Sequence, residues 1–173
     1  MQVKRTLLAL AGLFGLLAAG CTAGEAPPTS GAYFVQFPST AAAVATDFVQ
    51  VLVFDVNTPE QRGTICQDLI TGRIRGDKQT PSVDPPAPAA NICEMRAGRK
   101  PVPIPHGEKA LLVIAQRKDR SGELQDFLIG CAVMTIGDGD APLPVALRII
   151  SPQQPVPDTQ CGSVGEYCDD KCR

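Results

Sequence analysis

Apolar and polar positions alternate in short segments from residue 32 onwards, and this pattern predicts strands joined by turns. Residues 32–37 (AYFVQF) are typical of a short strand rich in aromatic residues, and residues 46–56 (TDFVQVLVFDV) are typical of a longer one. The longer segment carries apolar side chains at both alternating positions. We therefore expect a central strand that is covered on both faces of its sheet.

The clearest unit in the pattern is a β-hairpin. The apolar segments 109–117 (KALLVIAQR) and 124–136 (LQDFLIGCAVMTI) flank the polar turn 118–123 (KDRSGE), in which Ser121-Gly122 suits a positive φ. Residues 142–150 (PLPVALRII) predict a last strand. Pro144 restricts that strand to an edge of a sheet, because proline lacks the amide N–H of a central strand.

One segment follows a helical period instead. Residues 64–74 (TICQDLITGRI) carry apolar side chains at helical spacing, namely Ile65, Leu69 and Ile70. Thr64 and Gln67 fit a capping box at the start of this helix. Cys66 is expected on or beside its buried stripe.

The connections after this helix are rich in proline. Residues 77–90 (DKQTPSVDPPAPAA) form a loop too long for a tight connection, and we expect it to be exposed. Residues 91–95 and 100–105 (KPVPIP) are short apolar pieces, and the prolines fit the second only for an edge strand.

The order of these elements predicts the fold class. Six or seven strands, one helix and no alternation of strands with helices favour a mainly β chain, folded as a two-sheet antiparallel sandwich of immunoglobulin-like or prealbumin-like type. We divide the chain into an export segment, a tether, a sandwich domain and a Pro-rich linker with a Cys-rich tail, at residues 1–20, 21–31, 32–150 and 151–173.

The first 20 residues have the features of an export signal. Lys4 and Arg5 precede an uninterrupted run of 14 apolar or small residues, 7–20 (LLALAGLFGLLAAG). As a helix this run reaches roughly 21 Å, which is short of the roughly 30 Å hydrocarbon core of a bilayer. We therefore interpret it as a cleaved signal peptide rather than as a membrane span.

The end of this segment, Leu17-Ala18-Ala19-Gly20-Cys21, resembles the lipobox of bacterial lipoproteins, which type II signal peptidase recognises. The resemblance implies lipidation of the Cys21 thiol, cleavage before Cys21, and anchoring in a membrane by acyl chains such as palmitate. Thr22 follows Cys21 where Asp would favour inner-membrane retention, which implies the outer membrane, on its periplasmic or its surface face. The alternative is an ordinary signal peptide cut after Gly20, with Cys21 left as a thiol or in a disulfide.

The cysteines beyond Cys21 are even in number, which in an exported chain argues for disulfides and leaves 15 possible connectivities. They are Cys66, Cys93, Cys131, Cys161, Cys168 and Cys172. The first three lie in the body of the chain and the last three in its tail, so full pairing requires an odd number of bridges between tail and body. A redox pair in the tail is disfavoured because Asp169 and Asp170 raise the pKa of a neighbouring thiol.

Composition narrows the classes of partner. Cleavage removes Lys4 and Arg5 and leaves 14 basic and 18 acidic residues, a net charge of −4. This charge gives no electrostatic reason to bind nucleic acid or anionic headgroups. The chain has no Trp, and with few other aromatic residues it is poorly suited to stacking on sugars or bases.

Candidate reactive residues are sparse, and we predict no catalytic residue, cofactor or metal. The only histidine, His106, lies in a turn and lacks the neighbours of a hydrolytic triad. The pair Asp138 and Asp140 offers too few oxygens for Ca²⁺. The basic cluster at the hairpin tip, formed by Arg117, Lys118 and Arg120 around Asp119, is interpreted as a solvated turn or as a contact for an acidic partner.

Three functions remain open. We favour a non-enzymatic envelope lipoprotein with a structural or protein-binding role, whose long loop 77–90 contacts an envelope or extracellular protein. An exported inhibitor would need a rigid convex loop braced by a disulfide at each end. A carboxylate-based hydrolase would need two carboxylates with raised pKa in one cleft, chosen from Asp47, Asp55, Asp126, Asp138 and Asp140.

Overall fold

The structure, a computed structural model, describes residues 33–83, 90–97, 104–137, 143–150 and 155–172. The strands are β1 (Tyr33–Gln36), β2 (Phe48–Asp55), β3 (Gly107–Lys118), β4 (Leu124–Ile136), β5 (Leu143–Ala146) and β6 (Arg148–Ile149). The helices are α1 (Thr40–Val44), α2 (Pro59–Arg75), α3 (Ile92–Arg96) and α4 (Val164–Cys168). The predicted signal peptide and the whole predicted tether precede these ranges.

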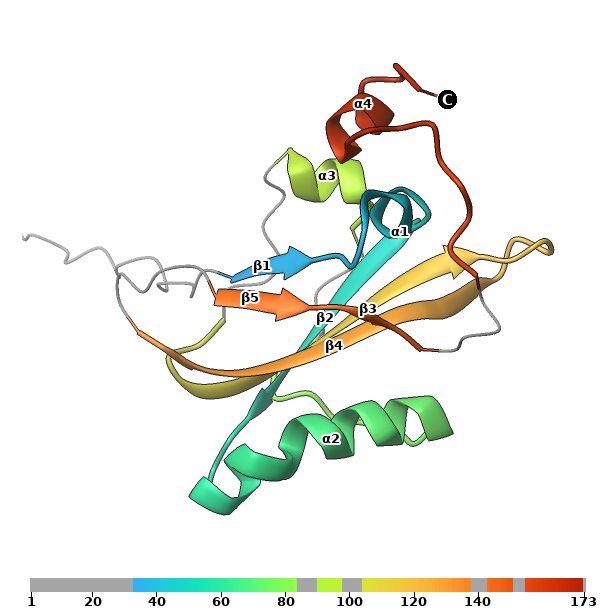
Figure 1. Cartoon of the computed structure of the whole chain (residues 1–173). Coiled ribbons are helices and arrows are strands. Elements are labelled where there is room, and N and C mark those ends of the chain that lie inside the picture. Colours follow the sequence, from blue (N-terminus) through green and yellow to red (C-terminus); the bar gives the residue numbers. More distant parts are fainter. Residues whose placement is uncertain (1–32, 84–89, 98–103, 138–142, 151–154, 173) are drawn as a thin grey trace, which may run out of the picture.

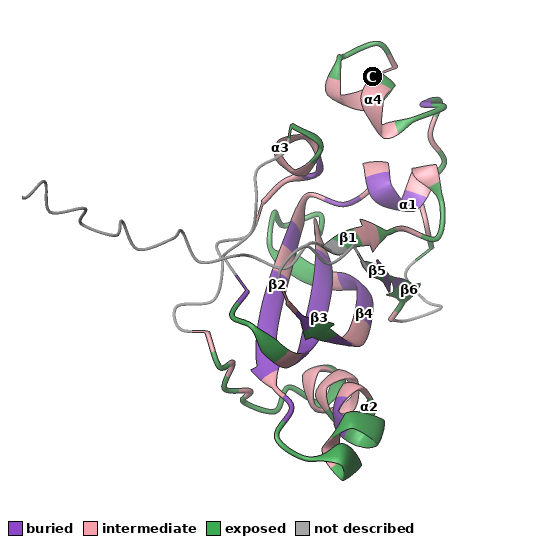
Figure 2. Ribbon diagram, turned by 90° about the vertical axis from the view of Figure 1, so that its left-hand side faces the viewer, coloured by how far each residue is buried: buried purple, intermediate pink, exposed green. Residues whose placement is uncertain are grey.

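A four-stranded antiparallel sheet in the order β2-β3-β4-β6 forms the centre of the molecule. The predicted hairpin is confirmed as β3 and β4, and its turn contains Gly122 at a φ of 86°. Residues 110–115 of β3 all have 0% exposure, because β3 has a strand on each side and both of its faces are covered. Figure 2 shows this buried strip along β2, β3 and β4.

β2 lies at an edge of this sheet, so its predicted central position is wrong, although its run of buried residues matches the predicted two-sided covering. The segment after α2 covers its outer edge. Val49 and Ala90 exchange backbone hydrogen bonds of 2.7 and 3.0 Å, and the Ser82 amide donates to the Val53 carbonyl at 2.8 Å. These bonds satisfy backbone groups that would otherwise be left open at a sheet edge.

Different elements cover the two faces of the central sheet (Figure 1). Helix α2 packs Ile65 against one face, where the cluster consists of Leu52, Phe54, Val56, Ala110, Leu112, Ile114 and Ile129. A second sheet, formed by β1 and β5, lies over the other face. The mainly β chain with two sheets is therefore confirmed. The second sheet is parallel and not antiparallel, since β1 and β5 run in the same direction, with Tyr33 beside Leu143 and Gln36 beside Ala146.

The predicted strand 142–150 divides between the two sheets. β5 pairs with β1, the next residue Leu147 donates its amide to the Gln36 carbonyl at 2.9 Å, and β6 then pairs with β4. The crossing brings two backbones so close that a Cβ at Gly130 would lie 2.2 Å from the Ala146 carbonyl oxygen. Gly130 is required at this crossing because any side chain would displace β5.

Helix α2 is confirmed but begins earlier than predicted. The Thr58 side chain accepts a hydrogen bond from the Gln61 amide at 3.2 Å, and Pro59 occupies the first helical position. The predicted capping box at Thr64 is wrong, because the pair Thr58-Pro59 supplies both a capping oxygen and a φ already suited to a helix. The helix ends at Gly76, whose φ is 79°.

The described residues contain three short helices beyond the one predicted. Helix α3 forms in the apolar piece 91–95 because Asn91 and Glu94 make a capping box, with hydrogen bonds of 2.8 and 3.0 Å. The hydroxyl oxygens of Ser39 and Ser163 cap α1 and α4, and each accepts one hydrogen bond from a backbone amide of the first turn. Each helix has five residues and depends on its cap and its packing, since propensity alone does not hold so short a helix.

Candidate interaction surface

All six cysteines beyond Cys21 are disulfide-bonded, in the pairs Cys66–Cys131, Cys93–Cys168 and Cys161–Cys172. One bridge lies within the body, one joins tail to body and one lies within the tail. A single bridge thus joins tail to body, which is an odd number, as the parity of the cysteines required. The pairing itself depends on which cysteines the fold brings together, with Cα atoms 5.2 to 5.4 Å apart.

The bridge Cys66–Cys131 fastens α2 to β4, and an ion pair supports the end of the same helix. Arg73 donates to Asp126 through Nε at 2.6 Å and Nη2 at 3.0 Å, and Gln116 donates to the same carboxylate at 2.9 Å. Burial alone would raise the pKa of Asp126, but the hydrogen bonds from Arg73 and Gln116 outweigh it, so this pKa lies below its ordinary value.

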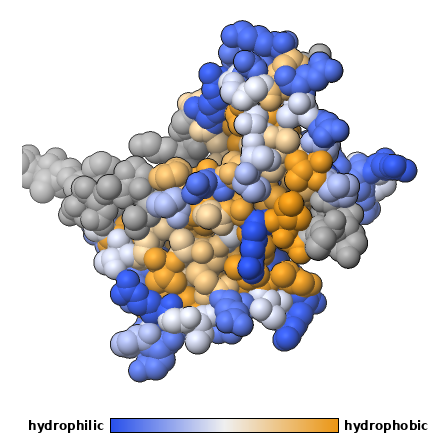
Figure 3. All heavy atoms as spheres, in the orientation of Figure 1, coloured by the Kyte–Doolittle hydropathy of each residue, from blue (hydrophilic) through white to orange (hydrophobic). Residues whose placement is uncertain are grey.

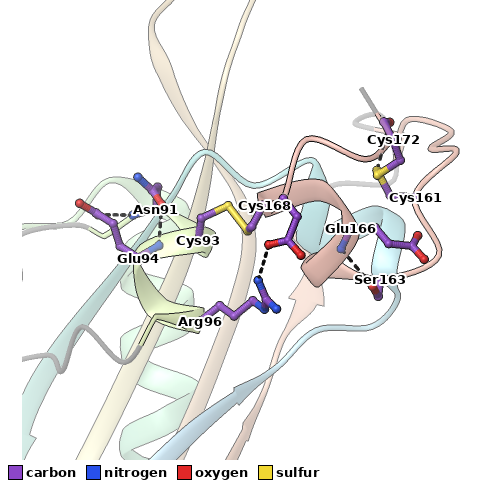
Figure 4. Close-up of a disulfide and its surroundings, with 10 residues drawn as sticks. Asn91, Cys93, Glu94, Arg96, Cys161, Ser163, Glu166, Cys168 and Cys172 are labelled. Carbon is purple, nitrogen blue, oxygen red and sulfur yellow. Dashed lines mark hydrogen bonds and ion pairs between the residues drawn. A yellow bond between two sulfur atoms is a disulfide. The ribbon is translucent and has the colours of Figure 1, made fainter.

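The C-terminal tail is held by covalent bonds and caps (Figure 4). Cys161–Cys172 closes its ends, and Cys93–Cys168 joins α4 to α3. Within the loop, Glu166 Oε2 accepts a hydrogen bond from the Gly162 amide at 2.7 Å, and Cys161 is the only buried residue of 155–172. The tail therefore keeps a defined shape with little burial of its own.

Ion pairs add to the contact between tail and body. Asp169 accepts hydrogen bonds from Arg96 of α3 at 3.1 Å and from Lys171 at 3.2 Å. Hydrogen bonds from Lys171 and then Arg96 hold the pKa of Asp169 below its ordinary value. Gly165 lies against the same guanidinium, since a Cβ there would be 3.3 Å from Arg96 Nη2.

A groove of about 450 Å³ lies between the hairpin tip and the segment 155–157. It is lined by Arg117, Lys118, Asp119, Arg120, Gln125, Pro155 and Pro157. The Arg117 guanidinium stacks 4.5 Å from the centre of the Phe127 ring and donates to the Pro155 carbonyl at 3.2 Å. The structure thus brings together the predicted basic cluster and two prolines far along the chain, which no sequence spacing indicated.

The Asp119 carboxylate stabilises the turn at the hairpin tip by accepting hydrogen bonds from it. Asp119 Oδ1 accepts hydrogen bonds from the Ser121 hydroxyl at 2.5 Å, the Ser121 amide at 2.8 Å and the Glu123 amide at 3.0 Å. The Ser121 side chain contributes most to lowering the pKa of Asp119. Asp119 therefore stays ionised and fixes the turn that carries Lys118 and Arg120.

The described carboxylates of the hydrolase hypothesis are held by other partners. Asp47 Oδ2 accepts a hydrogen bond from the Lys118 amide at 2.7 Å, at the start of β2, and Asp55 forms an ion pair with Lys109 at the end of β2. Asp126, whose pKa is lowered, pairs with α2. These contacts stabilise the fold, and the lowered pKa of Asp126 is the opposite of what a general acid needs.

The other sequence candidates are placed as follows. Asp138 and Asp140, the calcium candidates, lie outside the described residues. His106 is exposed immediately before β3. Within the described ranges no group of three or more His, Cys, Asp or Glu side chains is arranged to hold a metal ion. Of the loop 77–90, residues 84–89 lie outside the described part, and Ser82 and Ala90 bind the edge of β2.

No known protein family matches this chain, no curated protein matches it, and no solved structure matches it. In the part of the chain that the structure describes, no helix has both the length and the apolar composition needed to cross a bilayer.

Proposed function

We propose that this chain is a lipid-anchored envelope lipoprotein whose folded domain binds another protein and has no enzymatic role. The motif ending at Cys21 supports the anchor. The three disulfides support an oxidising compartment, since such bonds are rare in the reducing cytosol. The outer membrane is the proposed location, and a sandwich topology of immunoglobulin-like or prealbumin-like type stays a prediction.

One observation carries the protein-binding role: the start of β1, which follows the tether in sequence, and the hairpin tip lie at opposite ends of the domain. β1 starts beside Leu143, the first residue of β5, and runs parallel to β5. β5 leads into β6, which pairs with Leu128 in the half of β4 nearer the tip. Both β1 and β5 therefore run towards the tip. Figure 1 shows the start of β1 and the tip on opposite sides. The 12 residues 21–32 extend to roughly 40 Å at most, so the tether can hold the tip well away from the membrane.

The hairpin tip and the tail, which residues 155–160 connect to the groove, both have a fixed shape. The segment that leaves the groove at Pro157 leads directly into the tail with its two disulfides (Figure 1). Figure 3 shows hydrophilic side chains over the tail at the top and over the tip at the right. A surface already ordered by disulfides and a stiff turn loses less conformational entropy when a partner binds, which favours association.

The anchor is tested by the mass of the mature N-terminus. We expect a chain that begins at Cys21, carries three acyl chains and incorporates a labelled palmitate analogue. Cys21→Ser should abolish labelling, whereas Thr22→Ser should leave it unchanged. An unmodified thiol at position 21 in the purified protein would contradict the anchor.

The binding role is tested by photo-crosslinking in cells. A crosslinking amino acid is placed at one of three exposed glutamines: Gln125 at the tip, Gln160 at the start of the tail, or Gln67 on α2. Adducts with a defined protein should form several times more strongly from Gln125 and Gln160 than from the control Gln67. Equal adducts from all three positions, or none, would refute a distal binding surface. The loop 77–90 is the second proposed contact, and Lys78 tests it in the same experiment.

An exported inhibitor is the second candidate, because the segment 161–168 has a bonded cysteine at each end. It predicts that the purified chain inhibits a secreted peptidase, and that the paired change Cys161→Ala with Cys172→Ala removes the inhibition. A chain that the peptidases cleave within 162–167 without inhibition excludes this function.

A further inference from the structure

We infer that the groove between the hairpin tip and the segment 155–157 binds an extended acidic segment of a protein partner. This inference deepens the proposed protein-binding role and rests on it. It assigns a surface and a chemistry: carboxylates of the partner bound by Arg117, Lys118 and Arg120, with the aliphatic part of the segment lying on Pro155 and Pro157.

The first support is that these cations have no carboxylate partner within the described residues. Ion pairs there engage Arg62, Arg73, Arg96, Lys109 and Lys171. None engages a cation at the tip, and Asp119, the only carboxylate lining the groove, serves the turn through its hydrogen bonds. The groove therefore keeps positive charge that an acidic ligand can neutralise.

The second support is that two of the three cations, Arg117 and Lys118, have contacts that hold them in place before any ligand binds. Arg117 is fixed by the Phe127 ring and the Pro155 carbonyl, which uses one of the five N–H donors of its guanidinium. Lys118 Nζ lies 5.8 Å from the centre of the Phe48 ring. Fixed donors lose little entropy on binding, and a guanidinium matches the two oxygens of a carboxylate.

The third support is the contrast between the groove and the whole chain. The net charge is −2 for the full sequence, and −4 once the predicted signal peptide is removed. A large polyanion that spread over the molecule would meet this negative surface and be repelled. A short acidic segment that contacts only the tip and residues 155–157 avoids that repulsion, so the charge distribution favours it over an anionic membrane or a nucleic acid.

The test uses the full mature chain with its disulfides intact and a fluorescent eight-residue peptide of alternating Glu and Ala. The groove variant combines Lys118→Gln with Arg120→Gln. The matched control combines Arg75→Gln with Arg148→Gln, which removes the same charge from two exposed cations outside the groove and outside the loop 77–90. Arg117 is kept, because its stacking on Phe127 contributes to folding.

We expect the wild-type chain and the control to bind the peptide, and the groove variant to bind at least tenfold more weakly. A peptide of alternating Gln and Ala should not bind. Added salt should weaken binding of the Glu peptide, because salt screens the attraction between exposed charges. Equal losses in both variants would show general attraction and overturn the inference. The inference would also be overturned if the chain bound phosphatidylglycerol vesicles but not the peptide, and if the groove variant abolished that binding to vesicles.

Failure of this inference is distinguishable from failure of the proposed function. The peptide assay needs neither the lipid anchor nor the natural partner. If the peptide does not bind while Gln160 still crosslinks to a defined protein, only the acidic chemistry is wrong. If the peptide binds but no protein crosslinks from Gln125 or Gln160, the groove is correctly assigned and the cellular role is wrong.

Discussion

The central sheet and the C-terminal tail are ordered by different forces. In β3 the six residues 110–115 have 0% exposure, and burying each large apolar side chain there contributes about 1.5–3 kcal/mol. In the tail only Cys161 is buried among residues 155–172, yet two of the three disulfides lie at or within it. Burial stabilises the sheet, and covalent bonds replace burial in the tail.

This difference explains how the molecule presents a polar surface of fixed shape. A tail rich in Gly and Asp cannot bury enough apolar area to offset its conformational entropy, so without bridges it would be disordered. Disulfides reduce the entropy of the unfolded chain and require no apolar side chains, which leaves the exposed residues of the tail available for contacts.

The largest effect is expected where the two sheets cross. Gly130→Ala should lower the free energy of unfolding by about 3 kcal/mol, because the new Cβ would meet the Ala146 backbone oxygen at 2.2 Å. The control is Gly63→Ala in α2, where a Cβ meets nothing within 4 Å and where alanine should stabilise by about 0.5–1 kcal/mol. Urea denaturation measures both. Similar effects of the two changes would contradict the close approach.

Removing single disulfides should have different effects on the stability of the central sheet and of the tail. Cys66→Ala with Cys131→Ala should lower the global free energy of unfolding by about 3 kcal/mol, because this bridge joins α2 to the sheet. Cys93→Ala with Cys168→Ala should leave the amide protection of β3 nearly unchanged while amides of the tail exchange faster. Hydrogen exchange followed by mass spectrometry checks both results. Loss of protection in β3 from the second pair would show that the tail supports the sheet.

Acid should weaken the ion pair that joins α2 to β4. Because the folded-state pKa of Asp126 is depressed, its contribution to stability is complete above its unfolded pKa, near 4, and is lost as the pH falls through the folded value. Asp126→Asn should therefore cost about 1 kcal/mol at pH 7, and the difference from the wild type should shrink below pH 4. A difference that is constant between pH 7 and pH 3 would refute the assignment.

Removing helix caps should give the smallest effects: a change in global stability for α2 and a local change for α4. Thr58→Ala removes the cap of α2, which packs on the sheet, and should lower global stability by about 1 kcal/mol. Thr64→Ala should have almost no effect, because Thr64 is exposed within the helix. Ser163→Ala should only speed exchange within α4, where the disulfides keep the tail attached. Circular dichroism and hydrogen exchange distinguish these results.

The fold was predictable where local pattern and tertiary structure agree. The hairpin follows from two long apolar segments around a polar turn, and the helical stripe of α2 from the spacing of Ile65, Leu69 and Ile70. The edge position of β2 was not predictable, because backbone bonds from Ser82 and Ala90 cover that edge, and no side-chain period reports them.

The candidate surface was predictable only in part. The basic cluster of the tip is contiguous in sequence, so it was found. The nearer of the two groove prolines, Pro155, lies 38 residues from Arg117 in sequence, so only folding brings the prolines and the basic cluster together. Cysteine parity required an odd number of bridges to the tail but left the partner of each cysteine open.

The sequence by itself determined the strands, the hairpin, the even set of cysteines and the resemblance at Cys21, because each depends on neighbouring residues or on counting. The tertiary structure alone decided the parallel second sheet, the division of the last strand at Leu147, the disulfide pairs and the groove beside Pro155. These features depend on where distant segments meet, and that is set by packing both faces of one sheet at once.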